Sequence, residues 1–141
     1  MTYDSNKKER IASMIVLIVE DNELNRDMLS RRLMRRGFAT VLAVDGVEAL
    51  TLAQSKQPDV ILMDLSLPGM SGIDATRLLR ANTLTSKIPI IALTAHASGS
   101  DRDDALQAGC DDYDTKPVDM ARLVEKLEFI LTRTGALSRV V

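Results

Sequence analysis

Five polar side chains in this sequence directly follow short apolar or strand-like runs: Glu20, Asp21, Asp64, Thr94 and Lys116. If the runs form parallel strands of one sheet, their carboxyl ends meet at one edge and the five side chains converge there. Three carboxylates in so small a space repel, since unit charges ~4 Å apart cost about 4 kcal/mol at an effective dielectric near 20. A divalent cation and the Lys116 ammonium would relieve that repulsion. Oxygen-only ligands with open water positions favour Mg²⁺ over Zn²⁺ or copper.

Each of these residues alone has an ordinary structural explanation. An acid at a strand end, such as Asp21 or Asp64, is more often a helix N-cap than a metal ligand. A threonine after a buried strand is commonly a β-former that reaches solvent, and a lysine before proline commonly lies on the surface. All five residues, however, lie at the carboxyl ends of predicted strands in one small domain. This combination indicates a metal-dependent site.

The elements that must position these residues can be read from hydrophobic periodicity. Apolar or β-branched runs near residues 15–19, 39–43, 60–63 and 88–93 predict four strands, and a brief fifth strand is expected near residues 112–115. Amphipathic stretches predict helices near residues 24–36, 47–55, 73–79, 100–108 and 120–134. Strands that alternate with helices indicate right-handed βαβ units, and so an α/β doubly wound parallel sheet. Such sheets place their sites at the carboxyl ends of the strands.

The composition fits a single soluble domain. The chain has 141 residues, a 45% hydrophobic share and 18 basic against 20 acidic residues, so no net field recruits nucleic acid or anionic membrane. One cysteine cannot form an internal disulfide, and the apolar run 14–19 is too short to span a bilayer. We therefore expect a cytoplasmic protein with a polar N-terminal extension over residues 1–13, one domain over 14–134 and a short tail over 135–141.

The order Glu20-Asp21, Asp64, Thr94-Ala95, Lys116-Pro117 resembles the receiver domain of bacterial two-component signalling, in its stand-alone form. The resemblance covers residues 14–133. The stretches 19–22, 63–72 and 108–113 are similar to signatures of that family. It implies a flavodoxin-like fold with five helices around a five-stranded sheet in the order 2-1-3-4-5.

The resemblance also implies a role for each residue of the site. Asp64 would accept a phosphoryl group from a sensor histidine kinase or a histidine phosphotransfer protein. Glu20, Asp21, Asp64 and the carbonyl of Ser66 would hold the cofactor Mg²⁺, with Glu20 acting through water.

Two further groups would contact the phosphoryl oxygens. Lys116 would pair with Asp64 or with the phosphoryl group, and Thr94 would donate a hydrogen bond to it. Tyr113 matches the switching aromatic of the family, while Pro117 follows a peptide bond that is cis in the family. Such a domain is a switch rather than an enzyme, although it supports its own phosphorylation and slow autodephosphorylation.

Three alternatives remain open. Phosphatases and phosphotransferases with an aspartyl nucleophile use a similar sheet, but they usually need a second acid two residues later, where this chain has Ser66. A flavin-binding electron carrier would bind phosphate after the first strand, where Glu20 and Asp21 would repel it. A degenerate receiver acting as a scaffold would not need the complete set of acceptor, metal, threonine and lysine residues.

Several residues carry weaker signals. His96 is expected on an exposed loop over the site, where it and Ser66 could influence attack of water on an acyl phosphate. Cys110 is expected in the core, and Asp114 is expected to point outward as edge protection of the fifth strand. A basic cluster ends the first helix, where cations complement the helix dipole or recognise a partner: Arg31, Arg32, Arg35 and Arg36.

The expected output is protein–protein interaction. Residues 136–141 are too few for a DNA-binding output domain, so the signal would leave through the receiver's own surface. The fourth helix, fifth strand and fifth helix form the expected face, with Asp101, Asp103 and Asp104 near Arg122 and Lys126. Opposite charges on adjoining elements would suit either a homodimer or a separate partner.

Overall fold

The computed structural model describes residues 9–96 and 99–137. Five parallel strands form one sheet in the order β2-β1-β3-β4-β5, which confirms the predicted topology. The strands are β1 (Ile15–Val19), β2 (Ala39–Ala43), β3 (Val60–Asp64), β4 (Ile90–Thr94) and β5 (Asp112–Thr115). The helices are α2 (Glu23–Arg35), α3 (Gly46–Lys56), α4 (Gly72–Ala81), α5 (Gly99–Ala108) and α6 (Met120–Arg133). A short helical segment over residues 9–12 precedes β1.

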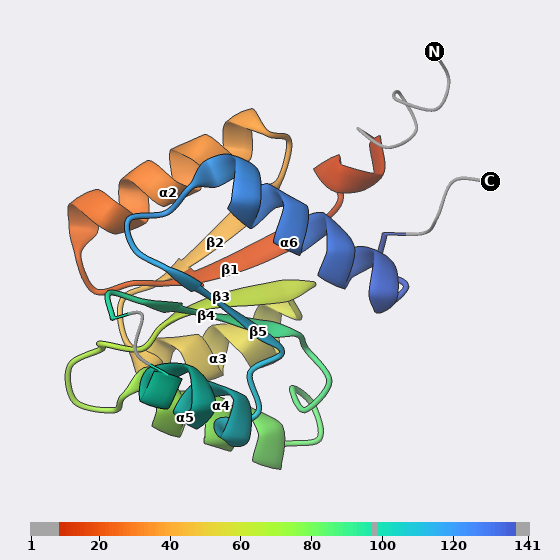
Figure 1. Cartoon of the computed structure of the whole chain (residues 1–141). Helices are drawn as coiled ribbons and strands as arrows, with labels where there is room; N and C mark the ends of the chain where they lie inside the picture. The colour runs from red at the N-terminus through yellow and green to blue at the C-terminus, as the bar shows by residue number, and fades with distance from the viewer. Residues whose placement is uncertain (1–8, 97–98, 138–141) are drawn as a thin grey trace.

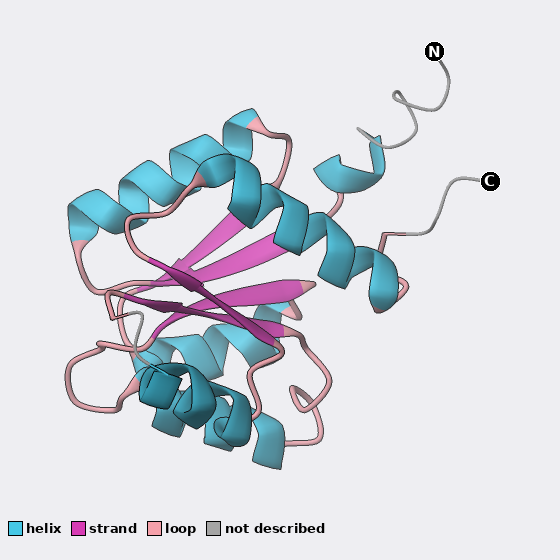
Figure 2. Cartoon of the chain, viewed as in Figure 1, coloured by secondary structure: helices cyan, strands magenta, loops and turns pink. Residues whose placement is uncertain are grey.

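Helices cover both faces of the sheet (Figures 1 and 2). α2 and α6 lie on one face, and α3, α4 and α5 lie on the other. Both central strands β3 and β4 are buried at every residue, as expected for strands covered on two sides. No helix of the described ranges is long and apolar enough to cross a membrane.

Successive side chains of a strand point to opposite faces of the sheet, so the core has two layers. Val16 and Ile18 pack under α2 and α6 with Leu33, Leu127 and other apolar residues. Leu17 and Val19 point to the opposite face, where small and branched residues of α3, α4 and α5 complete the second layer. The first layer also takes in Ile11 and Leu137, which are buried although they flank the central 14–134 segment.

Side-chain caps set where four of the helices begin. Asn22, Asp45, Ser71 and Asp119 each accept a hydrogen bond from the backbone N–H three residues later, which satisfies a donor that the first helical turn leaves open. The helix that was predicted over residues 47–55 begins at Gly46, directly after its cap Asp45. Because these caps fix where α2 and α4 begin, they also fix the loops after β1 and β3 that carry the candidate site.

One prediction about the sheet edge was wrong. Asp114 of β5 does not point outward as edge protection but is buried, with 3% exposure. Arg122 of α6 forms an ion pair with it at 2.8 Å, and the Arg122 Nε also donates to the carboxylate at 2.9 Å. The charge can be buried because α6 crosses this strand and supplies a guanidinium with matching geometry.

Candidate functional site

The predicted acidic residues do converge at the carboxyl edge of the sheet. Glu20 directly follows β1, Asp21 follows Glu20, and Asp64 is the last residue of β3. One carboxylate oxygen from each lies within 4.8 Å of those of the other two. Glu20 and Asp64 are buried, whereas Asp21 is exposed. Three oxygen donors that open to solvent on one side fit a hard divalent cation that retains water, as Mg²⁺ does.

Lys116 supplies the positive charge that the carboxylates need. Its ammonium lies 2.8 Å from Glu20 Oε1 and 3.2 Å from Asp64 Oδ2. Lys116 follows β5, and its backbone N–H donates to the carbonyl of Thr94, which holds it beside the end of β4. The Lys116–Pro117 peptide bond is cis. One ammonium thus bridges two of the three acids.

Burial and neighbouring charges shift two pKa values in the site. Burial raises the pKa of Glu20 above its ordinary value, and the hydrogen bond with Asp64 adds to that rise while Lys116 opposes it. Burial alone would lower the pKa of Lys116, but the hydrogen bond to Glu20 and the charge of Asp64 outweigh it and raise that pKa. Pairing with Lys116 alone would lower the pKa of Glu20, so the net rise means that burial, together with the neighbouring Asp64, outweighs that pairing.

The loop after β3 orients the Asp64 carboxylate. The backbone N–H of Ser66 donates to Asp64 Oδ1 at 2.9 Å, which leaves Oδ2 facing Lys116. Gly72, the first residue of α4, passes so close that an added Cβ would lie 2.2 Å from the Asp64 carbonyl oxygen. The loop can return over the strand end only because Gly72 has no side chain.

Thr94 stands at the end of β4, two strands from β1. Its hydroxyl donates to the carbonyl of His96 at 3.2 Å and accepts the His96 backbone N–H at 3.1 Å. Thr94 is buried with 2% exposure, while His96 is exposed as predicted. The predicted site residues Thr94 and Ser66 therefore flank Asp64 from two neighbouring loops.

Tyr113 lies outside this cluster, on β5 between two helices. The guanidinium of Arg102 lies 5.2 Å from its ring centroid and the ammonium of Lys126 lies 5.3 Å from it. Lys126 also donates to the Tyr113 carbonyl and lies 3.6 Å from Asp112. Cys110 is buried in the core as predicted, and burial raises the pKa of its thiol.

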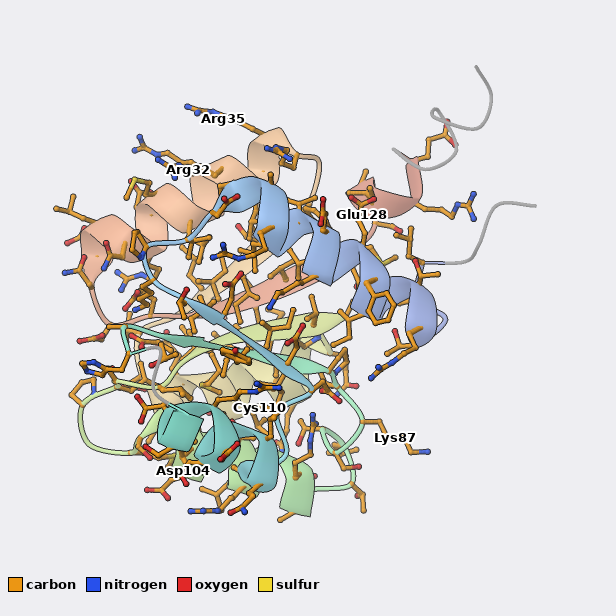
Figure 3. The ribbon with its side chains drawn as sticks, in the orientation of Figure 1. Arg32, Arg35, Lys87, Asp104, Cys110 and Glu128 are labelled. Carbon is orange, nitrogen blue, oxygen red and sulfur yellow. The ribbon has the colours of Figure 1, made fainter. Side chains whose placement is uncertain are left out.

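Sequence reasoning missed Arg26 as a part of the site. Its guanidinium donates to the carbonyl of Glu20 at 2.9 Å and lies 3.5 Å from that of Asp21, so it braces the loop that presents both acids. Its place on the first turn of α2, six residues after Glu20, was the available signal. The basic cluster, expected either to complement the helix dipole or to recognise a partner, lies farther along α2, where Arg32 and Arg35 extend from the helix (Figure 3).

The comparison with known families agrees with this geometry. Residues 16–128 match the response regulator receiver domain family. The polar-differentiation response regulator DivK of Brucella anthropi is 40% identical over 116 residues, which are 82% of this chain and 94% of that protein.

Solved structures show the same fold. The receiver domain of sensor histidine kinase PA1611 from Pseudomonas aeruginosa, with magnesium in its active site cleft, is 40% identical with a TM-score of 0.79, over 84% of this chain and 97% of that one. A putative response regulator from Chloroflexus aurantiacus is 33% identical with a TM-score of 0.82, over 85% and 98% of the two chains. The chemotaxis protein CheY4 of Vibrio cholerae is 30% identical with a TM-score of 0.79, over 84% and 98%.

Proposed function

Because this chain belongs to the response regulator receiver domain family, we propose that it is a signalling switch activated by phosphorylation of Asp64. One observation carries the proposal. Asp64 is 1% exposed, yet its carboxylate lies 3.2 Å from the Lys116 ammonium and within reach of the Glu20 and Asp21 carboxylates. A buried aspartate is costly unless charges compensate it, and this arrangement suits a carboxylate that must act as a nucleophile.

The residues of the chain divide the chemistry of phosphoryl transfer among them. A carboxylate oxygen of Asp64 attacks the phosphorus of a phosphohistidine in line with the leaving imidazole nitrogen, so a P–O bond forms as the P–N bond breaks. Lys116 and the hydroxyl of Thr94 receive the charge on the phosphoryl oxygens, and the Ser66 N–H holds the attacking carboxylate in place. Bound Mg²⁺ would neutralise further phosphoryl charge, held by Glu20, Asp21, Asp64 and the carbonyl of Ser66.

The donor is a sensor histidine kinase or a histidine phosphotransfer protein. A groove of about 500 Å³ starts at Glu20 and Lys116 and runs between α2 and the loop after β5, with Met28, Pro117 and Val118 in its lining. Arg32 lies on its rim. An apolar floor with polar groups beside the acceptor is what a donor helix needs to bring its phosphohistidine to Asp64.

The phosphorylated state would differ from the unphosphorylated one at Thr94 and Tyr113. In this structure the Thr94 hydroxyl donates a hydrogen bond to the backbone carbonyl of His96, and the Tyr113 ring makes cation–π contacts with Arg102 and Lys126. We expect the phosphoryl group to draw Thr94 away from His96 and to open room for Tyr113 to turn inward. His96 and Ser66, on the two loops beside Asp64, would influence attack of water on the acyl phosphate.

The output is interaction with a protein rather than catalysis or DNA binding, in a cytoplasmic protein. The face of α5, β5 and α6 contains Tyr113 and is a candidate for a homodimer. Two of its cations are engaged within the chain, however, since Arg122 pairs with Asp114 and Lys126 with Asp112. That engagement favours a separate partner over a dimer built on those charges, and sedimentation with and without beryllofluoride distinguishes them.

Substituting the acceptor tests the proposed function. The wild-type protein should gain the mass of one phosphoryl group on incubation with a small phosphodonor and Mg²⁺, and Asp64→Asn should gain none. Asp21→Asn should keep the fold, measured by circular dichroism, and bind Mg²⁺ more weakly. Full labelling of Asp64→Asn would place the acceptor elsewhere and contradict the assignment.

A further inference from the structure

A narrow pocket lies beside the acceptor, on the side away from the α2 groove. Its volume is about 150 Å³. Its lining includes Ser66 and Thr94, which lie on the chain segments beside Asp64, and Asp101 and Asp104 of α5. The remaining lining comes from Leu65, Ile73 and His96. Because Ser66 donates directly to the Asp64 carboxylate, a group in this pocket would approach the reacting atoms.

The charges around Asp64 are therefore unequal on its two sides. The groove at α2 is lined by two cations, Lys116 and Arg32, and one acid, Glu20. The pocket at α5 presents two carboxylates and, apart from the imidazole of His96, no basic side chain in its lining. Figure 3 shows Asp104 on α5 on the opposite side of the sheet from Arg32 and Arg35 on α2. An anion meets attraction when it approaches along α2 and repulsion when it approaches along α5.

We propose that Asp104, together with Asp101, selects against small dianionic phosphodonors, so that the switch answers to protein donors that dock along α2. This inference rests on the proposed function of Asp64. It adds a specificity determinant, since the two acids line the pocket beside the acceptor and are not part of the cluster of Glu20, Asp21 and Asp64. A free acyl phosphate must bring its charge into that space, whereas a phosphohistidine on a protein arrives through the groove.

The same acceptor can be phosphorylated by two small donors that differ in charge. With acetyl phosphate, Asp64 attacks phosphorus, the P–O bond breaks, and acetate leaves with the electron pair. With phosphoramidate, the P–N bond breaks and the nitrogen, already protonated, leaves as ammonia. The first donor is a dianion that releases an anion, and the second carries less negative charge and releases a neutral molecule. The acidic pocket lining should slow the first donor more than the second, and salt should screen the effect.

The experiment measures initial rates of phosphorylation by mass spectrometry, with both donors at one Mg²⁺ concentration. Asp104→Asn should raise the rate with acetyl phosphate several-fold and leave the rate with phosphoramidate nearly unchanged. The ratio of the two rates should rise further in the variant that also carries Asp101→Asn. Added salt should speed acetyl phosphate labelling of the wild-type protein more than that of the variants.

Asp103→Asn is the matched control, because it removes the same charge from the same helix at an exposed position outside the pocket lining. An unchanged ratio in Asp104→Asn, or an equal rise in Asp103→Asn, would overturn the proposal. Failure of the proposed function looks different: the wild-type protein would then be labelled by neither donor.

Discussion

The candidate site places three carboxylates around one ammonium, and burying this excess of negative charge has a cost in the metal-free protein. Lys116 contacts Glu20 and Asp64, while Asp21 remains at the exposed side of the cluster. Burial, reinforced by the neighbouring Asp64, raises the pKa of Glu20, so the metal-free fold favours its protonated form. The site is thus built for a cation that would complete its charge balance, at the expense of stability when the cation is absent.

Glu20→Gln should separate the stability cost of the buried carboxylate in the metal-free protein from its contribution to magnesium binding. Because the folded pKa of Glu20 is raised, its favourable contribution is present at acid pH, below its unfolded pKa, and is lost as pH rises through the folded value. At neutral pH the ionised side chain therefore costs stability, and the variant should melt at a higher temperature in the presence of a chelator. Magnesium affinity should fall by roughly tenfold or more, measured by titration.

The wild-type protein without metal should likewise gain stability on acidification through the Glu20 pKa, and the variant should lack that gain. Glu125→Gln, at an exposed position of α6, is the control and should change neither quantity. A melting temperature in chelator that falls in Glu20→Gln would show that the Lys116–Glu20 pair outweighs the repulsion.

At the scale of elements, the site depends on how closely the β3–α4 connection passes the end of its own strand. The atoms that an added Cβ at Gly72 would meet all belong to the backbone of Asp64 and Leu65, at 2.2 to 3.0 Å. Backbone atoms cannot rotate out of the way as a flexible side chain can. A substitution here must displace either the start of α4 or Asp64, the proposed phosphoryl acceptor.

Gly72→Ala should therefore lower the free energy of unfolding by about 1–3 kcal/mol and slow the phosphorylation of the molecules that remain folded. Urea unfolding and labelling with a small phosphodonor measure the two effects. Gly99→Ala is a matched control, because Gly99 is also the first residue of a helix and its added Cβ would meet nothing within 4 Å. Equal behaviour of the two variants would show that the close approach does not constrain Asp64.

Hydrophobic periodicity was sufficient to predict the strands, since the runs that form β1, β3 and β4 are apolar without interruption and end at the polar residues of the site. It could not predict the environment of Asp114. The sequence places that residue on a strand, but which face α6 covers depends on tertiary packing, and its partner Arg122 resembles any solvent-exposed helical arginine. The same holds for Ile11 and Leu137, whose burial depends on contacts with distant elements.

At the scale of the whole molecule, one side chain joins several chain segments at the end of the sheet opposite the site. Arg80 of α4 donates to the carbonyls of Gly109, Ser86 and Ile88 and forms an ion pair with Asp111 at 2.8 Å. The same Asp111 carboxylate accepts the backbone N–H of Ile90 at the start of β4. Three of the four partners of Arg80 are backbone carbonyls, which leave no sign in the sequence, so this network could not be predicted from it.

Arg80→Met should leave those carbonyls and Asp111 without their donor while keeping most of the side chain's apolar stem. The partly buried guanidinium makes hydrogen bonds worth about 1.5–3 kcal/mol each to charged partners and less to neutral ones, so we expect a loss of about 2–4 kcal/mol in urea unfolding. Arg77→Met is the matched control on the same helix, since its pair with Asp74 is exposed and should be worth less than about 1 kcal/mol.

Because the network lies at the amino ends of β4 and β5, magnesium affinity and phosphorylation rate should be unchanged in the folded Arg80→Met variant. A loss of magnesium binding in Arg80→Met under conditions where it remains folded would show that the two ends of the sheet are coupled, contrary to this expectation.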